Sequence, residues 1–245
     1  MNRQPIRIER HRELESTQTY CLERAEDIHG VWVVLAENQM QGMGRKGSKW
    51  ISSCGSLTFS MCIENVFLED SALLAAHCIK EALERSEVRN LSIKWPNDLC
   101  IDWNGEEKKV CGVIVNTVHT ATGTASIIGV GLNISGNIPY FTLADAEYKL
   151  DKEQIFTDAV QILSKKFLAK KSERNWLTCF AGKHIFLDGK RYEIASVKDS
   201  ITLSSENEQL VISSQEYSYC AERNMLLRKS KHAALAEDAG IVGAL

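Results

Sequence analysis

Five short apolar runs between residues 31 and 132 have the length and composition of buried β-strands. They cover residues 31–36, 56–63, 91–95, 110–118 and 125–132. Two longer segments place apolar residues at helical spacing instead. One runs over residues 71–85, with Asp70 or Ser71 as its cap, and the other over about 152–172. The pattern predicts a folded chain of mixed α and β structure.

The hydrophobic pattern changes after Gly182, where the apolar runs become shorter and more closely spaced. These runs cover residues 184–187, 191–197, 200–204 and 209–213, and turn-forming residues separate them. Such spacing predicts a small antiparallel barrel. Residues 230–245 are small and polar without an apolar stripe, which predicts a flexible tail. We therefore expect one domain over residues 1–182, a second over 183–229 and a tail over 230–245.

The net charge and the spacing of the cysteines limit which ligands, metal sites and cell compartments fit this chain. With a formal net charge of -3 and a pI near 6.1, the chain has no general attraction for DNA or acidic membranes, so any phosphate site must be local. No stretch is apolar enough for a bilayer span or a secretory signal. The eight cysteines never form the close pairs of a zinc site. We therefore expect free thiols and a reducing, cytoplasmic location.

A glycine-rich stretch from Gln39 to Gly55 contains four glycines and three basic residues, which predicts a loop and not a periodic element. Residues 42–47 fit the pattern G-x-G-x-x-G of dinucleotide-binding sites. Their context does not fit, because residues 37–41 separate them from the preceding strand and residues 48–53 lack helical spacing. A nicotinamide-dependent oxidoreductase is therefore the least favoured function. An ordinary flexible surface loop remains an alternative.

Two further segments place polar residues at the ends of apolar strands. The string Lys-Trp-Pro-Asn-Asp at residues 94–98 ends one strand, and residues 108–116 begin another after a short hairpin. Two antiparallel strands would bring a lysine, an amide, a carboxylate and a second lysine into one neighbourhood. Residues 127–133 form an apolar strand whose two glycines permit close approach and whose asparagine stands at the exit. By itself, this last segment indicates only a buried strand.

Taken together, these segments resemble the biotin–protein ligase family in content, order and spacing across nearly the whole chain. The segments that match are residues 15–18, 36–39, 42–50, 94–98, 109–112 and 129–133. The Lys-Trp-Pro-Asn-Asp string is the most distinctive of them. The resemblance implies an α/β (α+β) fold. Its catalytic domain would be of the class II aminoacyl-tRNA-synthetase-like type with a mixed sheet, and a small SH3-like β-barrel would follow.

The resemblance also implies an activity and a biotin site. The enzyme would convert biotin and ATP to biotinyl-5'-AMP and transfer biotin to a lysine of a biotin carboxyl carrier protein or domain. The residues it assigns to biotin are Ser16, Thr17, Gln39, Gly42, Trp50, Lys109 and Gly112. The first three would grip the ureido ring, and the loop from Gly42 to Trp50 would close over the ligand.

The same resemblance implies an ATP site and a set of catalytic residues. The residues assigned to ATP or the adenylate are Arg45, Lys46, Asn97, Asn133 and Tyr140. The residues assigned to catalysis are Arg45, Lys94, Lys109 and Asp98, the last of them near Mg²⁺. Bringing a carboxylate onto a triphosphate pushes like charges together, so cations aimed at the developing charge fit this chemistry. A loop that excludes water would protect the adenylate.

The chain departs from the family's usual Gly-Arg-Gly-Arg loop at Met43, where an unbranched thioether cannot replace a guanidinium fork. This departure keeps open a protein that binds biotin or its adenylate with weak transfer. A lipoate–protein ligase shares the fold and the adenylation chemistry, but the Lys-Trp-Pro-Asn-Asp string favours biotin. The residues before Glu15 leave no room for a DNA-binding helix-turn-helix, so repressor activity is not expected. Both a monomer and a homodimer remain open.

Overall fold

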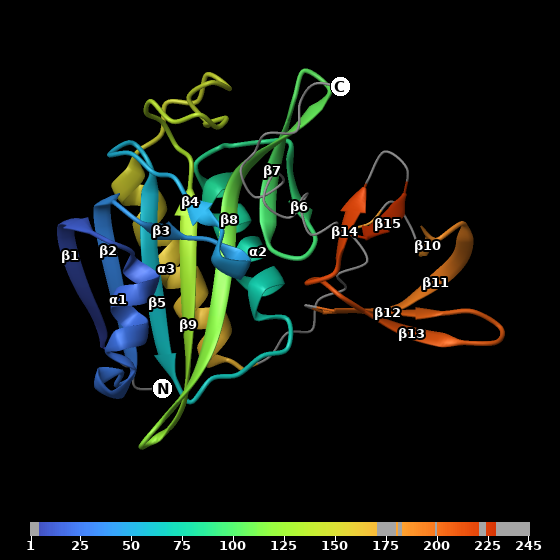
Figure 1. The fold of residues 1–245 in the computed structure, drawn as a ribbon. Coiled ribbons are helices and arrows are strands. Elements are labelled where there is room, and N and C mark those ends of the chain that lie inside the picture. Colours follow the sequence, from blue (N-terminus) through green and yellow to red (C-terminus); the bar gives the residue numbers. More distant parts are fainter. Residues whose placement is uncertain (1–4, 171–179, 181–182, 199, 221–223, 229–245) are drawn as a thin grey trace.

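The computed structural model describes residues 5–170, 180, 183–198, 200–220 and 224–228. The described strands form two large sheets, with helices packed on the first, and one small hairpin (Figure 1). No helix within these residues is both long and apolar enough to cross a membrane.

The first sheet is mixed and has seven strands in the order β1-β2-β5-β9-β8-β7-β6. These strands are β1 (Ile6–Leu14), β2 (Val31–Gln39), β5 (Leu57–Glu64), β9 (Gly123–Leu132), β8 (Glu106–Thr120), β7 (Asp98–Trp103) and β6 (Leu91–Lys94). β1 and β2 run parallel, and every other neighbouring pair is antiparallel. The mixed sheet expected from the resemblance is therefore present.

Helices cover both faces of this sheet. α2 (Ser71–Arg85) and α3 (Lys152–Leu168) contact each other and pack on one face (Figure 1). The shorter α1 (Thr17–Glu23), followed by the 3-10 turn η1 (Ala25–Asp27), contacts β5 and β9 from the other side. The sheet is thus shielded from water on two sides, which explains why its central strands read as nearly continuous apolar runs.

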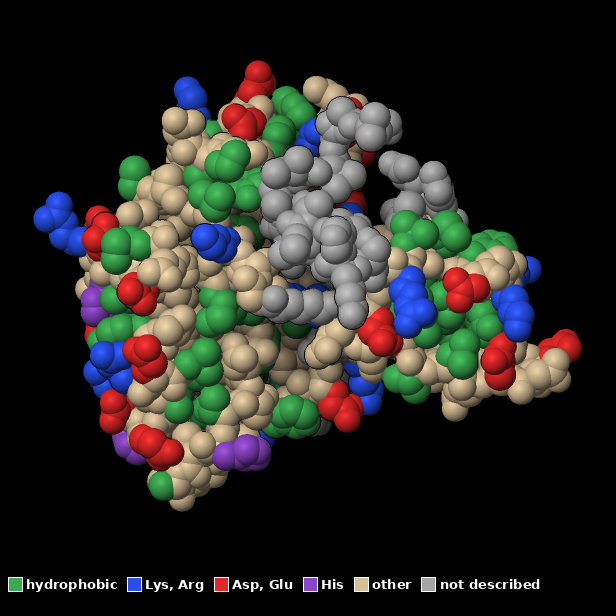
Figure 2. Space-filling model, viewed as in Figure 1, with side chains coloured by type: hydrophobic (Ala, Val, Ile, Leu, Met, Phe, Trp, Pro, Cys, Tyr) green, Lys and Arg blue, Asp and Glu red, His purple; other side chains and the backbone are tan. Residues whose placement is uncertain are grey.

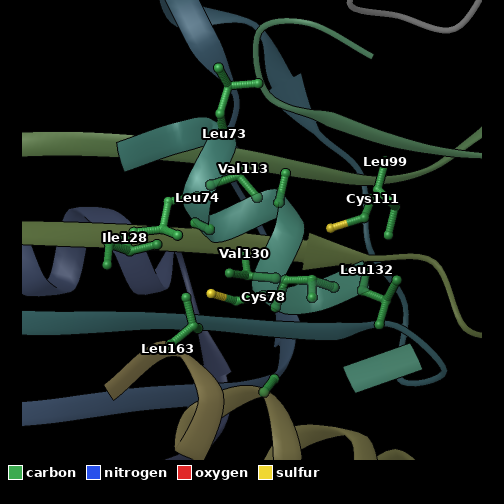
Figure 3. Close-up of a cluster of buried hydrophobic side chains, with 14 of the residues drawn as sticks. Leu73, Leu74, Cys78, Leu99, Cys111, Val113, Ile128, Val130, Leu132 and Leu163 are labelled. Carbon is green, nitrogen blue, oxygen red and sulfur yellow. The ribbon is translucent and has the colours of Figure 1, made fainter. Parts of the chain in front are cut away.

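Two hydrophobic clusters hold these layers together. In the larger cluster, Leu74 of α2 and Leu163 of α3 lie over Ile128 of β9 (Figure 3). The smaller cluster lies under α1 and contains Cys21 and Ile127. Ile127 and Ile128 belong to different clusters because successive side chains of a strand point to opposite faces.

The second sheet has six strands in the order β13-β12-β11-β10-β15-β14 and lies on the β6 side of the first (Figure 1). Its strands are β10 (His184–Leu187), β11 (Lys190–Val197), β12 (Ser200–Ser204), β13 (Gln209–Ser213), β14 (Tyr217–Cys220) and β15 (Met225–Arg228). Neighbours are antiparallel except β10 and β15, which run parallel. The antiparallel architecture predicted after Gly182 is therefore present, with one parallel pair that was not predicted.

The boundaries of the predicted elements are confirmed to within a few residues, with larger extensions at β2 and β8. The second helix is shorter than expected and ends at Leu168, with Ala169 as its C-cap. Lys170 adopts a left-handed φ of 51°, a conformation that commonly follows a helix end. Residues 171–172 and the predicted tail over 230–245 lie outside the described residues.

Outside the glycine-rich stretch, β1, α1, η1, β7, β14 and β15 were not predicted. β1 is an edge strand whose charged residues point to solvent, so its apolar alternation is weak. α1 has only seven residues, too few to show a helical stripe. In β7 the buried run is limited to residues 99–101. Packing against neighbouring elements stabilises these segments, and their own hydrophobic patterns are too weak to predict them.

The glycine-rich stretch has more regular structure than predicted. Two short strands, β3 (Gly42–Met43) and β4 (Lys49–Trp50), form a hairpin around the 3-10 turn η2 (Arg45–Gly47). The expectation of a loop without regular elements was therefore wrong for residues 42–50. The hairpin is too short to be visible as an alternating pattern.

Candidate active site

A cavity of about 1100 Å³ opens between the first sheet, the β3–β4 hairpin and the second sheet, which contributes Tyr219 and Leu227. Twelve of the fourteen residues predicted for the site line this cavity. The two exceptions are Gly42, which pairs with Trp50 in the hairpin, and Lys46, whose side chain is not among the described ones. The tertiary structure therefore gathers segments that span most of the chain.

Polar groups at the start of α1 form part of the cavity wall. Thr17 donates from both its N–H and its hydroxyl to Gln39 Oε1, at 2.8 and 3.1 Å. Ser16 caps the same helix, and its Oγ accepts from Thr19 N–H at 3.4 Å. Because helix capping and a strand end fix these side chains, a ligand meets them in a set orientation.

Two further residues, Gln18 and Ser60, extend this network and were not predicted as site residues. Ser60 Oγ lies 2.9 Å from Thr17 Oγ1 and 2.8 Å from Gln18 Oε1. Gln18 Nε2 donates to Asn116 Oδ1 at 2.9 Å and to the carbonyl of Ile127 at 3.0 Å. A serine inside an otherwise apolar strand was the available signal, because a buried hydroxyl needs a partner.

Glycines of β8 and β9 make room for the indole of Trp50. Gly112 and Gly131 lie opposite each other in the β8–β9 ladder. A Cβ on Gly131 would stand 2.3 Å from Trp50 Cε2, and one on Gly112 would stand 3.0 Å from Trp50 Cζ3. Gly129 makes similar room for Gln18, whose Oε1 would lie 2.5 Å from its Cβ. The close approach predicted for this strand is confirmed.

Arg45 joins the hairpin to both sheets. Its Nη1 donates to Asn97 Oδ1 at 2.9 Å, and its Nη2 donates to Ser214 Oγ at 2.8 Å. Asn97 lies in the turn between β6 and β7, and its Nδ2 donates to the carbonyl of Val113 at 2.7 Å. Both polar atoms of the Asn97 amide therefore have protein partners. A ligand that takes up the carbonyl oxygen must compete with Arg45 for it.

Two pairs of lysine and carboxylate lie along β6, β7 and β8. Lys109 Nζ stands 2.9 Å from Asp98 Oδ1, and Lys94 Nζ stands 3.5 Å from Glu107 Oε2. Partial burial acts to lower the pKa of Lys94, but the negative charges of Glu107 and Asp98 outweigh it and raise the pKa. Lys94 is therefore cationic at neutral pH. The two lysines, the amide and the carboxylate do meet, but the predicted pairing of two strands was wrong, because β7 lies between β6 and β8.

The cavity carries an excess of positive charge. Its described lining holds five cations and three carboxylates, which are Arg45, Lys49, Lys94, Lys108 and Lys109 against Asp98, Glu107 and Asp145. On the outer face shown in Figure 2, both signs of charge are interspersed and form no continuous basic surface. A chain of net charge -3 thus holds a local site suited to an anion.

Asn133, directly after β9, offers an unused acceptor. It is 2% exposed, and its Nδ2 donates to the carbonyl of Phe141 at 3.2 Å. Its Oδ1 is buried without a hydrogen-bond partner among the described residues. Such an atom costs about 1–3 kcal/mol, so a ligand N–H placed against it would be bound favourably. Tyr140 lines the cavity a few residues further on.

The buried cysteines of the described chain are poor candidates for a nucleophile. Six of them are free thiols, and five of those are buried. Burial raises the pKa of Cys100 and of Cys111, so both thiols stay protonated at neutral pH. Cys179 and the side chain of Cys220 lie outside the described part.

Comparison with known protein families matches residues 11–133 to the Biotin/lipoate A/B protein ligase family. The chain is 26% identical over 156 residues to the bifunctional ligase/repressor BirA of Escherichia coli strain K12, which covers 58% of this chain and 47% of that protein. It is 28% identical over 129 residues to a biotin–[acetyl-CoA-carboxylase] ligase of Paracoccus denitrificans, covering 50% and 52%. The chain thus spans about half the length of these curated relatives.

Solved structures share the fold over nearly the whole chain. A biotin protein ligase from Aquifex aeolicus in complex with biotin and ATP has a TM-score of 0.66 and 24% identity, covering 91% of this chain and 99% of that one. A biotin acetyl coenzyme A carboxylase synthetase from Helicobacter pylori has a TM-score of 0.58 and 21% identity, covering 93% and 98%. The fold expected from the resemblance is therefore confirmed.

Proposed function

This chain belongs to the biotin/lipoate A/B protein ligase family, and on that premise we propose that it is an ATP-dependent biotin–protein ligase. It forms biotinyl-5'-AMP and transfers the biotinyl group to a lysine of a biotin carboxyl carrier domain. The observation that carries this proposal is the meeting, in one cavity, of a buried polar network at α1 with a group of cations on the hairpin, β6 and β8. ATP as a substrate also supports a cytoplasmic location.

The polar network suits the ureido ring of biotin, which has both N–H donors and a carbonyl acceptor. In this proposal Ser16, Thr17 and Gln39 bind the ring, and their fixed orientation supports the assignment. The hairpin from Gly42 to Trp50 covers the ligand. Gly112 contributes by leaving space beside the indole.

The cations suit the adenylation step. A carboxylate oxygen of biotin attacks the α-phosphorus of ATP, the bond to the β-phosphate breaks, and pyrophosphate leaves. Arg45, Lys94 and Lys109 hold the two anions together and stabilise the charge that develops, with Lys46 assigned to the same phosphates. Asn133 Oδ1 accepts a hydrogen bond from the exocyclic amine of adenine, which satisfies a buried atom that has no partner among the described residues.

The remaining adenine contacts follow from the same placement. Tyr140 lines the same cavity as Asn133 and offers an aromatic face, and Asn97 offers its carbonyl once Arg45 turns to the phosphate. Arg45 would thus exchange a neutral partner for an anionic one, and charge-assisted hydrogen bonds are the stronger of the two.

Mg²⁺ is usually held by one or two carboxylates together with the phosphates of the substrate. Asp98 and Glu107 line the cavity, and the described residues contain no group of three or more metal-ligating side chains. This donor set fits an ion that arrives with ATP. Asp98 Oδ1 is buried and lies 2.9 Å from Lys109 Nζ, so an ion held by Asp98 would share this carboxylate with the lysine. When bound, the ion adds positive charge at the phosphates.

The transfer step needs an amine and protection from water. The lysine nitrogen of the carrier attacks the acyl carbon of the adenylate, AMP leaves with the bonding electron pair, and the nitrogen loses a proton to solvent. A hairpin that covers the mixed anhydride limits its hydrolysis. Trp50, seated against Gly112 and Gly131, anchors that cover to the sheet.

Lipoate ligation is the second candidate, because the family includes both activities. The dithiolane ring of lipoate has no N–H or carbonyl group to pair with Thr17 and Gln39. A site built for hydrogen bonding discriminates strongly against a ligand that lacks the matching groups. The network at α1 therefore favours biotin.

The test is a labelling assay with the purified chain, ATP, Mg²⁺ and a biotin carboxyl carrier domain. We expect biotin to be attached to one lysine of the carrier, and a carrier with that lysine changed to arginine to stay unlabelled. Lipoate in place of biotin should give no product. Failure to label with correctly folded protein contradicts the ligase proposal, and labelling with lipoate alone would favour the second candidate.

A further inference from the structure

Ser214 is a residue of the second sheet that reaches the hairpin of the first. It lies in the turn between β13 and β14, at 169 positions from Arg45 in sequence, and is 7% exposed. Its Oγ accepts a hydrogen bond from Arg45 Nη2 at 2.8 Å, and its carbonyl oxygen lies 3.5 Å from the same nitrogen. The contact exists only when both sheets are folded.

The backbone around Arg45 does not fix the direction of its side chain. Gly44 N–H donates to the carbonyl of Ser48 at 2.8 Å, and Ser48 N–H donates to the carbonyl of Arg45 at 3.0 Å, so the turn is closed on itself. Gly47 has a left-handed φ of 78°, and no atom of the described residues lies within 4 Å of where its Cβ would stand. The direction of the guanidinium therefore depends on the partners of the side chain.

We propose that Ser214 is a positioning residue for adenylation, holding Arg45 so that its charge faces the substrates. In the ligand-free chain the guanidinium is held at Nη1 by Asn97 and at Nη2 by Ser214. When Nη1 exchanges Asn97 for the phosphate, the contact of Nη2 with Ser214 still orients the guanidinium plane. Without the serine hydroxyl, the guanidinium loses this contact and its charge spreads over several directions. Preorganised charge stabilises a transition state, so the loss falls on the rate more than on biotin affinity. This inference rests on the proposed ligase function.

Matched controls separate this role from a purely structural link. Lys198 of the second sheet pairs with Glu69 ahead of α2, so Glu69→Ala removes a different contact between the sheets. Ser213 is the neighbour of Ser214, and its hydroxyl accepts from Gln215 N–H at 3.1 Å within the same turn. Ser213→Ala therefore removes a hydroxyl of the turn and leaves the contact to the hairpin in place.

Kinetics of pyrophosphate release by the full chain test the role. We expect Ser214→Ala to lower kcat about tenfold, at the lower end for a lost hydrogen bond to a charged group, and to leave KM for biotin within about twofold. Ser214→Thr keeps the hydroxyl and should restore the rate, while both controls should stay within about twofold of wild type. In an Arg45→Ala background, Ser214→Ala should lower kcat no further, because Ser214 acts through the side chain of Arg45.

Hydrogen exchange of the ligand-free chain gives a readout that does not depend on turnover. Residues 44–50 should exchange faster in Ser214→Ala than in wild type or in either control. Unchanged kcat and exchange overturn the role, and so does a loss that persists in full when Arg45 is already alanine. A wild-type chain that releases no pyrophosphate instead refutes the ligase function, and the exchange data then still decide whether Ser214 holds the hairpin.

Discussion

Lys109 pairs with Cys100 in the β7–β8 ladder, and its side chain reaches Asp98 at the start of β7, with Nζ of the lysine 2.9 Å from Oδ1 of the carboxylate. The pair lies in the cavity beside Lys94 and Asn97. An anion entering this site meets a cation whose position is already fixed by a neighbour of opposite charge. Such an arrangement stabilises developing charge without reorganisation at the moment of reaction.

Lys109→Ala should lower the rate of adenylate formation by roughly 10²-fold or more, as the loss of one preorganised contact to developing charge often does. The fold should persist, because the side chain of Lys109 is 39% exposed. Pyrophosphate release measures the effect, with Lys80→Ala on α2 as a control that removes an equal charge outside the cavity. A rate near that of wild type would remove Lys109 from the site.

Arg45→Gly should weaken retention of the adenylate more than it weakens the fold. The residue stands between two glycines at positions 44 and 47, and its guanidinium supplies the contacts that join the hairpin to both sheets. Adenylate that leaves the cavity would acylate exposed lysines of any protein nearby. Biotin incorporated into a bystander protein in the same tube measures this leakage. An equal background for variant and wild type would show that Arg45 does not retain the intermediate.

Met43→Arg should tighten binding of biotin when an ATP analogue is present. Met43 lies directly opposite Lys49 in the β3–β4 hairpin, so a new guanidinium would stand close to an existing cation. An anion between the two would turn that repulsion into a shared contact, worth roughly 1.5–3 kcal/mol when desolvated. Calorimetric titration with biotin, with and without a non-hydrolysable ATP analogue, measures it. Unchanged or weaker affinity in both titrations would mean that other residues of the hairpin already compensate for the missing arginine at position 43.

Gly131→Ala should destabilise the protein by about 1–3 kcal/mol, the usual cost of overpacking a filled site. The new methyl group would stand 2.3 Å from Trp50 Cε2, so the indole would have to move away from the sheet. The same substitution in a Trp50→Ala background should cost much less, because the clash is gone. Urea unfolding of the four proteins measures the difference. An equal cost in both backgrounds would show that Trp50 does not occupy this space.

Glu81→Gln should lower the free energy of unfolding by up to about 1 kcal/mol at pH 7, because both ends of the ion pair remain partly exposed. Glu81 on α2 lies 2.6 Å from Lys166 Nζ on α3, and this contact with Arg85 nearby outweighs partial burial and lowers the pKa of the carboxyl below its ordinary value of 4.5. A lowered pKa in the folded state stabilises the fold above 4.5, and this contribution is lost as the pH falls through the lowered pKa. Unfolding curves from pH 7 to pH 3 should therefore converge for wild type and variant. A difference that is constant over this range would mean that the ion pair contributes nothing.

Hydrophobic periodicity was sufficient to locate the central strands β2, β5 and β9 and the helices α2 and α3. Burial on a sheet or against one imposes a repeat on the chain, and that repeat can be seen without any partner. The Lys-Trp-Pro-Asn-Asp string at residues 94–98 was equally informative about the family, because the turn between β6 and β7 is formed by residues that are adjacent in the chain. Local sequence also predicted that Asp98 and Lys109 would meet, but by pairing residues 91–95 with residues 108–116, whereas the unpredicted strand β7 lies between those two strands.

Only the tertiary structure decided which polar groups meet. The pairing of Ser60 with Gln18, the hold of Ser214 on Arg45 and the use of Asn97 by that same arginine join residues far apart in the chain. A hydrogen bond needs its two atoms within about 3 Å and in line. Their spacing in the sequence carries no information about that distance, since it is set by how the hairpin and the two sheets pack.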